Sequence, residues 1–222
     1  MEDEGTNQQR YLSQLDMATA LVNFLLANGS DVNLKTGFPD LCTSPLLLAL
    51  EKGHHEVIKA LLAHGADVDD ENLREAILQC NKKALEMLIA KYGIHKCKID
   101  LLELAAEAGD TEISQMLLGE GLDQEQALLK AIEHGKAEIV TLLLAHGTDP
   151  DIPSIRESAI DKAIFHRHIG IMEVLLHHGA KIYPEALGSA KLFAPEHIVK
   201  LAEQFPVHSL HKKAAYPALY NV

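Results

Sequence analysis

Apolar residues recur along this chain at intervals of three and four, which is the period of a helix with one buried face. The clearest stretch is SPLLLALEKGHHEVIKALLAHGADVD, residues 44–69, in which Leu46, Ala49 and Leu50 form one stripe. A break at Gly53 separates it from a second stripe of four residues, Val57, Ile58, Leu61 and Leu62. The pattern predicts two short helices, joined by a turn, that share an apolar side.

The ends of these two helices carry their own signals. Ser44 can cap the first helix, and Pro45 suits its first turn, where no N–H partner is needed. Gly65 follows the second helix at the position where a left-handed residue ends it. Such a pair cannot bury its apolar side alone, so we expect it to stack on neighbouring pairs.

The same signature recurs down the chain. Glycines are expected to end second helices at Gly29, Gly65, Gly93, Gly121, Gly147 and Gly179. Turns at mid-pair are predicted at Gly53, Asn81, Gly109, Gly135 and Arg167. A small first-helix residue recurs as Ala49, Ala105, Ala131 and Ala163, with Ile77 in its place in the third pair. The pattern predicts about seven pairs, over residues 10–33, 44–69, 72–94, 100–122, 126–150, 158–182 and 184–205.

The run Ser44-Pro45-Leu46-Leu47-Leu48-Ala49 resembles the Thr-Pro-Leu-His-x-Ala opening of the ankyrin repeat family, with Ser for Thr and Leu for His. The resemblance implies an all-α ankyrin-repeat solenoid with hairpin fingers between repeats. The family period is about 33 residues, whereas the closing glycines here are 36, 28, 28, 26 and 32 residues apart. We therefore expect fingers at residues 33–43 and 149–157 and shortened junctions in the middle repeats.

The flanks of the repeats differ from them in composition. Residues 1–9 are polar and acidic, which predicts a disordered lead-in rather than a secretory signal. Residues 206–222 hold two prolines and several apolar residues, which predicts a tail that packs in part on the last repeat. Its final residues, Tyr220-Asn221-Val222, also resemble a peptide that PDZ domains bind by strand addition.

Net charge and cysteine content limit the partners and the setting. A formal charge of −12 argues against nucleic acid or an anionic membrane as the partner. No apolar run reaches the roughly 18 residues needed to span a bilayer. Three cysteines, Cys42, Cys80 and Cys97, do not make a disulfide framework. We expect a monomer in the cytoplasm, or in the host cytoplasm if the chain is a secreted bacterial effector.

Histidine and cysteine provide the only candidates for chemistry. His177-His178 and His166-x-His168 are the densest histidine cluster, but His178 shares its place before the closing glycine with His64 and His146, which favours a structural role. Cys97 lies two residues from His95, a conceivable nucleophile and base. Lys130 and Lys162 are expected to lay their stems along apolar surface with the ammonium group in water. We predict no enzyme activity, no metal and no cofactor.

The resemblance implies protein binding by the fingers and by the two residues before each mid-pair turn. The predicted contacts are Phe38, Leu41, Glu51, Lys52, Glu107, Glu133, His134, Ile155, Arg156, Phe165 and His166. The equivalent pair in the third repeat is Gln79-Cys80. Three glutamates in this set favour a basic segment in the partner. The expected function is a non-catalytic protein-interaction module; the alternatives are a metal- or thiol-dependent enzyme and the interaction part of a longer, effector-like protein.

Overall fold

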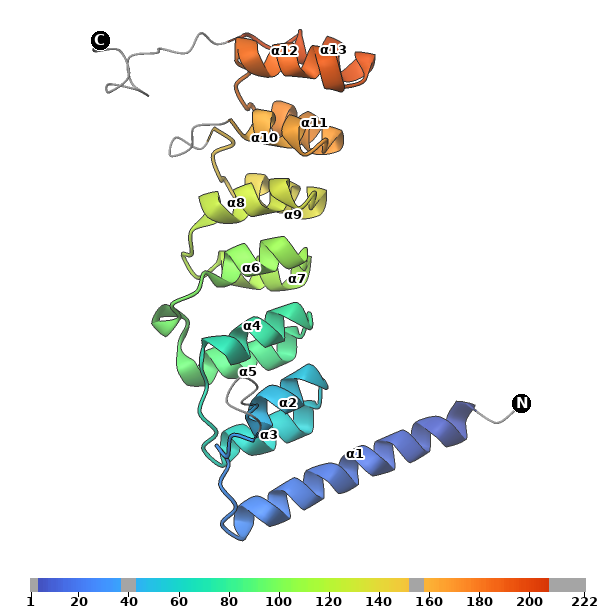
Figure 1. Ribbon diagram of the computed structural model, residues 1–222, viewed down its shortest axis with the longest axis vertical. Coiled ribbons are helices and arrows are strands. Elements are labelled where there is room, and N and C mark those ends of the chain that lie inside the picture. The colour runs from blue at the N-terminus through green and yellow to red at the C-terminus, as the bar shows by residue number, and fades with distance from the viewer. Residues whose placement is uncertain (1–3, 37–42, 152–157, 208–222) are drawn as a thin grey trace. The chain divides into compact units, whose positions relative to one another are not determined.

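The computed structural model describes residues 4–36, 43–151 and 158–207 and is helical, with two isolated β-bridges among these residues. The all-α repeat fold expected from the sequence is confirmed. Contacts divide the chain into two units, residues 1–101 and 102–222. In each unit short helices follow one another in pairs (Figure 1). The first helix of a pair is called the inner helix below, and the second the outer helix.

The first unit contains a long N-terminal helix and two pairs. Inner helices α2 and α4 pack on each other, as do outer helices α3 and α5, and α1 packs on α3. The helices are α1 Glu4–Ala27, α2 Pro45–Glu51, α3 His55–Ala63, α4 Asp70–Leu78, α5 Lys82–Tyr92 and the 3-10 helix η1 Ile94–Lys96. Fully buried leucines and isoleucines, such as Leu50, Ile58, Leu73 and Leu85, form the core between the layers.

The second unit contains four pairs, and it begins within α6. Inner helices α8, α10 and α12 pack in succession, and outer helices α7, α9, α11 and α13 do the same. The helices are α6 Leu101–Ala108, α7 Thr111–Leu118, α8 Gln124–Glu133, α9 Ala137–Ala145, α10 Ala159–Phe165, α11 Ile169–His177, α12 Pro184–Phe193 and α13 Glu196–Ala202.

Four inner helices, α2, α4, α8 and α10, begin at side-chain caps, as the sequence indicated for the first of them. Ser44 accepts a hydrogen bond from the N–H of Leu47 at 3.1 Å, and Pro45 is the first residue of α2. Asp69 and Ser158 form full capping boxes, in which a side chain three residues later returns a bond to the N–H of the cap residue. These bonds satisfy N–H groups that have no partner inside the helix.

The first repeat differs from the prediction. A single continuous helix, α1, spans Glu4–Ala27, where a disordered lead-in through residue 9 and a separate inner helix were expected. Met17 occupies the position that corresponds to Gly53 when Gly29 is matched to Gly65. Gly53 has a φ of +66°, a conformation that is unfavourable for methionine. The helix therefore continues through the place where the other repeats turn.

The mid-pair turn of the third repeat lies one residue earlier than predicted. Cys80, with a φ of +51°, holds the left-handed position, and Asn81 instead caps α5 by accepting a bond from the N–H of Ala84. The inner-helix alanine of this repeat is consequently Ala76, which is fully buried, rather than Ile77. A small buried residue thus stands at this position in all five of these inner helices, at Ala49, Ala76, Ala105, Ala131 and Ala163.

The junctions agree with the spacing argument where the structure describes them. Thr36 and Thr43 pair through two backbone hydrogen bonds of 3.2 and 3.0 Å, which closes the base of the first predicted finger. No β-bridge is present in the three shortened junctions, all of which fall in described parts of the chain, and one of them contains η1. The start of the tail is held by a parallel bridge between Val207 and Ile182.

Candidate protein-binding surface

The predicted contacts lie at the C-terminal ends of the inner helices, beside the mid-pair turns. In the first unit these positions are Glu51 and Lys52 at the end of α2, and Leu78 and Gln79 at the end of α4. The sequence had indicated Gln79-Cys80, because it placed the turn of that repeat one residue too late. The correction adds Leu78, which is 57% exposed and therefore offers apolar surface where a polar residue had been expected.

A shallow polar hollow separates these two helix ends. It has a volume of about 470 Å³ and is lined by Glu51, Lys52, Gly53, His55, Gln79, Cys80, Asn81, Lys82 and Lys83. His55 and Asn81 join its walls through a contact of 2.9 Å between Nε2 and Oδ1. Charges of both signs line the hollow, so in the first unit the row of helix ends is not uniformly acidic.

In the second unit, four charged residues on α6, α8 and α10 form a chain of ion pairs. The Nζ of Lys130 lies 3.7 Å from Glu133 and 3.9 Å from Glu103. The Nζ of Lys162 lies 3.8 Å from the same Glu133 oxygen. Each side chain is about a quarter to a third exposed, so both lysines are paired as well as partly solvated. The carboxylate of Glu133 is consequently shared between two cations.

The neighbouring helix ends carry a second, weaker pair. His134 Nε2 lies 3.8 Å from Glu107. A neutral imidazole does not balance the charge of a carboxylate, and only a protonated ring does. Of the predicted acidic contacts in this unit, Glu133 therefore pairs with two lysines, and Glu107 pairs with a histidine.

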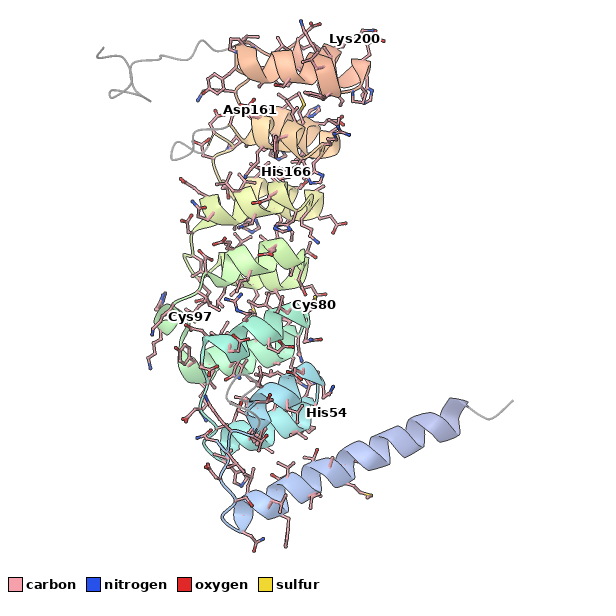
Figure 2. The ribbon with its side chains drawn as sticks, viewed as in Figure 1. His54, Cys80, Cys97, Asp161, His166 and Lys200 are labelled. Atoms are coloured by element: carbon pink, nitrogen blue, oxygen red, sulfur yellow. The ribbon has the colours of Figure 1, made fainter. Side chains whose placement is uncertain are left out.

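Phe165, the last residue of α10, stands almost free of the core. It is 79% exposed, and its ring meets that of His166 edge-on, with centroids 5.1 Å apart and planes at 83°. His166 in turn stacks on His168, with centroids at 6.1 Å and planes at 9°. Figure 2 places His166 beside the turn that follows α10. The side chain of Phe165 is thus exposed, and its ring contacts the ring of His166.

The next inner helix ends in two further exposed apolar residues that the sequence did not single out. Leu192 is 78% exposed and Phe193 is 61% exposed at the end of α12. Leu192 and Phe193 hold the same place before the turn as the contacts predicted in other pairs. The last pair has no closing glycine by which to align its turn, so the sequence did not indicate these two residues.

The remaining predicted contacts, Phe38, Leu41, Ile155 and Arg156, lie outside the described residues. Asp151, at the edge of the second finger, accepts a backbone bond from Lys181 at 2.8 Å and pairs with its Nζ at 2.9 Å. This hydrogen bond to Asp151 raises the pKa of Lys181. The beginning of that finger is therefore anchored to the residues that lead into α12.

Cys97 lacks the environment of a nucleophile. Burial, and then the negative charge of Asp70, raise the pKa of its thiol, and the thiolate is the form that reacts. Its Sγ lies 3.9 Å from the carbonyl oxygen of Gly93. Among the described residues, no three or more His, Cys, Asp or Glu side chains converge closely enough to bind a metal ion.

The histidines before the closing glycines have a shared structural role. The Nδ1 atoms of His64, His146 and His178 lie 2.8–2.9 Å from the carbonyl oxygen four residues earlier, at the ends of α3, α9 and α11. Each of these carbonyl groups also accepts a hydrogen bond from the backbone N–H of the same histidine, so the ring adds a second contact at the end of the helix. None of the helices in the described part of the chain is long and apolar enough to cross a bilayer.

Comparison with known proteins adds to this description. Residues 13–100 and 102–186 each match the family described as ankyrin repeats in three copies. The chain is 27% identical over 164 residues to the ankyrin repeat and KH domain-containing protein mask-1 of Caenorhabditis elegans, a match covering 72% of this chain and 5% of that protein. It is 30% identical over 83 residues to 2,3-bisphosphoglycerate-independent phosphoglycerate mutase 1 of Arabidopsis thaliana. This match covers 37% of this chain and 14% of that protein. The chain thus spans a small part of these relatives.

Among solved structures, the ankyrin repeat domain of Bcl-3, described as a unique member of the IkappaB protein family, is similar with a TM-score of 0.66 and 18% sequence identity. The similarity covers 86% of this chain and 94% of that one. At this level of identity the likeness concerns the fold.

Proposed function

Because this chain belongs to the ankyrin repeat family, whose repeats generally act as protein–protein interaction modules, we propose that it binds a partner protein through the exposed ends of its inner helices. Phe165 carries the proposal. Aromatic residues dominate the energy of protein interfaces, and this one is 79% exposed, at the end of an inner helix. Its edge-on contact with His166 restricts the ring, so that less conformational entropy is lost on binding.

The surroundings of Phe165 indicate what the partner offers. An apolar pocket on the partner accepts the ring, and Leu192 and Phe193 extend the apolar contact along α12. Glu107 accepts a basic residue of the partner segment, because His134 neutralises it only when protonated. Glu133 contributes less, since Lys130 and Lys162 already pair with it. The fingers, with Phe38, Leu41, Ile155 and Arg156, complete the proposed contact in this hypothesis.

The setting and the wider context of the protein remain predictions from the sequence. A reducing cytoplasm fits an odd number of cysteines, and a host cytoplasm would apply to a secreted effector. The raised pKa of Cys97 gives no support to the thiol-dependent alternative.

Affinity capture from a cell lysate tests the proposal with a matched control. Phe165→Ala should reduce the recovery of the partner about tenfold or more, since interface aromatics are worth roughly 2 kcal/mol. Phe24→Ala removes another exposed phenylalanine, 64% accessible, from α1 and should leave recovery unchanged. Equal recovery by wild type and Phe165→Ala would show that the proposed surface is wrong.

A further inference from the structure

The polar hollow between the ends of α2 and α4 is open because a short residue stands at one mid-pair turn. In the second unit a long side chain fills the equivalent place: Lys136, the residue before α9, lies over Gly109, so that a Cβ added to this glycine would be 2.8 Å from it. Asn81, the residue before α5, is its counterpart in the first unit. Nothing lies within 4 Å of a Cβ added to Gly53. The gap between these turns, the second of which Cys80 marks in Figure 2, is therefore not filled by Asn81.

Asn81 holds a fixed pair of hydrogen-bond donors at this hollow. Its Oδ1 accepts a bond from the N–H of Ala84 at 3.0 Å and lies 2.9 Å from Nε2 of His55. An amide oxygen can only accept, so Nε2 of His55 is the donor in this contact. Both contacts use the oxygen, and the Nδ2 group has no partner among the described residues. Two N–H groups are thus held in one orientation and left available to a ligand.

The charge of the lining is positive, although the whole chain has a formal charge of −12. Three lysines, Lys52, Lys82 and Lys83, line the hollow with one carboxylate, that of Glu51. With histidine counted as neutral, three positive charges and one negative charge leave +2. A phosphate monoester carries about −1.5 to −2 at pH 7 and three strong acceptor oxygens. Its charge balances that of the lining, whereas a carboxylate would balance about half of it.

We propose that this hollow binds a phosphorylated side chain of the partner protein. The lysine ammonium groups balance the charge of the phosphate, and the amide of Asn81 donates to one of its oxygens. Pockets for small molecules enclose most of the ligand, whereas this hollow is shallow and suits a group that a larger molecule presents. The net charge of −12 opposes nucleic acid as the source of the phosphate. The inference rests on the proposed function, because the hollow lies at the ends of two inner helices.

Titration of the whole 222-residue chain with N-acetyl-phosphoserine amide, followed by NMR, tests the site without the partner protein. Backbone signals of residues 51–55 and 79–83 should shift, with a dissociation constant of roughly millimolar size because exposed ion pairs are weak. N-acetyl-glutamate amide, with a single charge, should bind about fivefold more weakly or less. Equal binding of the two probes would overturn the proposal, as would shifts spread evenly along the chain.

Two variants remove different parts of the site. Asn81→Asp keeps an oxygen to cap α5 but replaces the N–H donors with negative charge, so binding of the phosphoserine probe should be lost. Lys52→Ala with Lys83→Ala should weaken binding about tenfold, because each exposed ion pair contributes up to about fivefold. Lys59→Ala with Lys98→Ala is the matched control, since both lysines are exposed in the same unit and lie outside the hollow. This control should change binding by less than about twofold.

Circular dichroism should show the same helix content in wild type and Asn81→Asp, because aspartate caps helices as well as asparagine does. Phosphoserine binding that survives Asn81→Asp would overturn the proposal. An equal loss of binding in the Lys59→Ala, Lys98→Ala control would also overturn it, because general attraction to lysines would then explain the shifts.

The titration and the capture experiment separate this site from the surface at Phe165. Phe165→Ala should bind the phosphoserine probe as wild type does, so the site can be present even where the proposed surface at Phe165 is wrong. In the capture experiment, treating the lysate with phosphatase should lower recovery by wild type to that of the Lys52→Ala, Lys83→Ala variant. Recovery that phosphatase leaves unchanged would overturn the assignment of the hollow to the partner, whatever the result for Phe165→Ala.

Discussion

Single side chains at the mid-pair turns fix neighbouring repeats of the second unit to one another. His168, the residue that precedes α11, lies over Gly135 of the preceding turn, with its Nε2 3.2 Å from the carbonyl oxygen of Glu133. Lys136 lies over Gly109 in the same way, one repeat earlier. Both glycines have positive φ, so absence of a Cβ serves the turn and the close approach together.

Gly135→Ala should lower the free energy of unfolding by about 1–2 kcal/mol. The cost arises because φ is +71° and the new Cβ would lie 2.7 Å from Cε1 of His168. Chemical denaturation would measure it. Gly170→Ala in α11 is the matched control, since a Cβ there meets nothing within 4 Å, and it should not lower stability. Adding His168→Ala to Gly135→Ala should recover part of the loss, and no recovery would contradict the proposed close contact.

At the scale of the element, the sequence predicts helices well where caps and apolar stripes coincide. Helix α2 begins at the predicted cap, and its three stripe residues are buried. Two local exceptions could not be read from the pattern. The left-handed residue of the third turn is a cysteine, which gives no turn signal, and the first repeat lacks a turn residue at Met17. In the third repeat, Asn81 was the more plausible turn residue, but Cys80 adopts the left-handed conformation. In the first repeat, the helix continues through Met17.

Helix α7 contains a buried hydroxyl group with an unsatisfied hydrogen-bonding capacity. Ser114 is fully buried, and its Oγ has no partner among the described residues. Ser114→Ala removes that desolvated group and adds a better helix former, so we expect the free energy of unfolding to rise by about 1 kcal/mol. Gln115→Ala, at the exposed neighbouring position, should change stability by a few tenths of a kcal/mol. A destabilised Ser114→Ala would mean that this hydroxyl group does have a partner.

At the scale of the whole molecule, repetition makes the overall fold predictable and leaves the surface less so. The helix pairs after the first repeat follow from periodicity, as do the buried alanines of the inner helices except Ala76. The ion pairs of Glu133 and the exposure of Leu78 and Leu192 depend on which residues lie side by side in space, which periodicity does not specify. The predicted finger contacts lie outside the described residues and stay predictions.

Stability in such an array is carried by contacts between nearest neighbours. Ile198 of α13 and Leu143 of α9 are both buried, but α9 has outer helices on both sides, α7 and α11, whereas α13 ends the described series. Each change to alanine should cost about 2–4 kcal/mol locally. Hydrogen exchange should accelerate from α11 to α13 for Ile198→Ala, and from α7 to α11 for Leu143→Ala. Identical exchange maps would contradict the nearest-neighbour description.

The contact of His168 with the turn at Gly135 affects how repeats can be added to a protein of this kind. Suppose that a gene duplication copies one helix pair, from the start of its inner helix to the end of its outer helix. The glycine of the copied turn then lies beneath a side chain of a different neighbouring pair. A duplication that runs from Gly135 through His168 carries both halves of the contact with it. In the second unit, the segment that keeps this contact when it is duplicated therefore runs from the turn of one helix pair to the turn of the next. It does not coincide with a single helix pair.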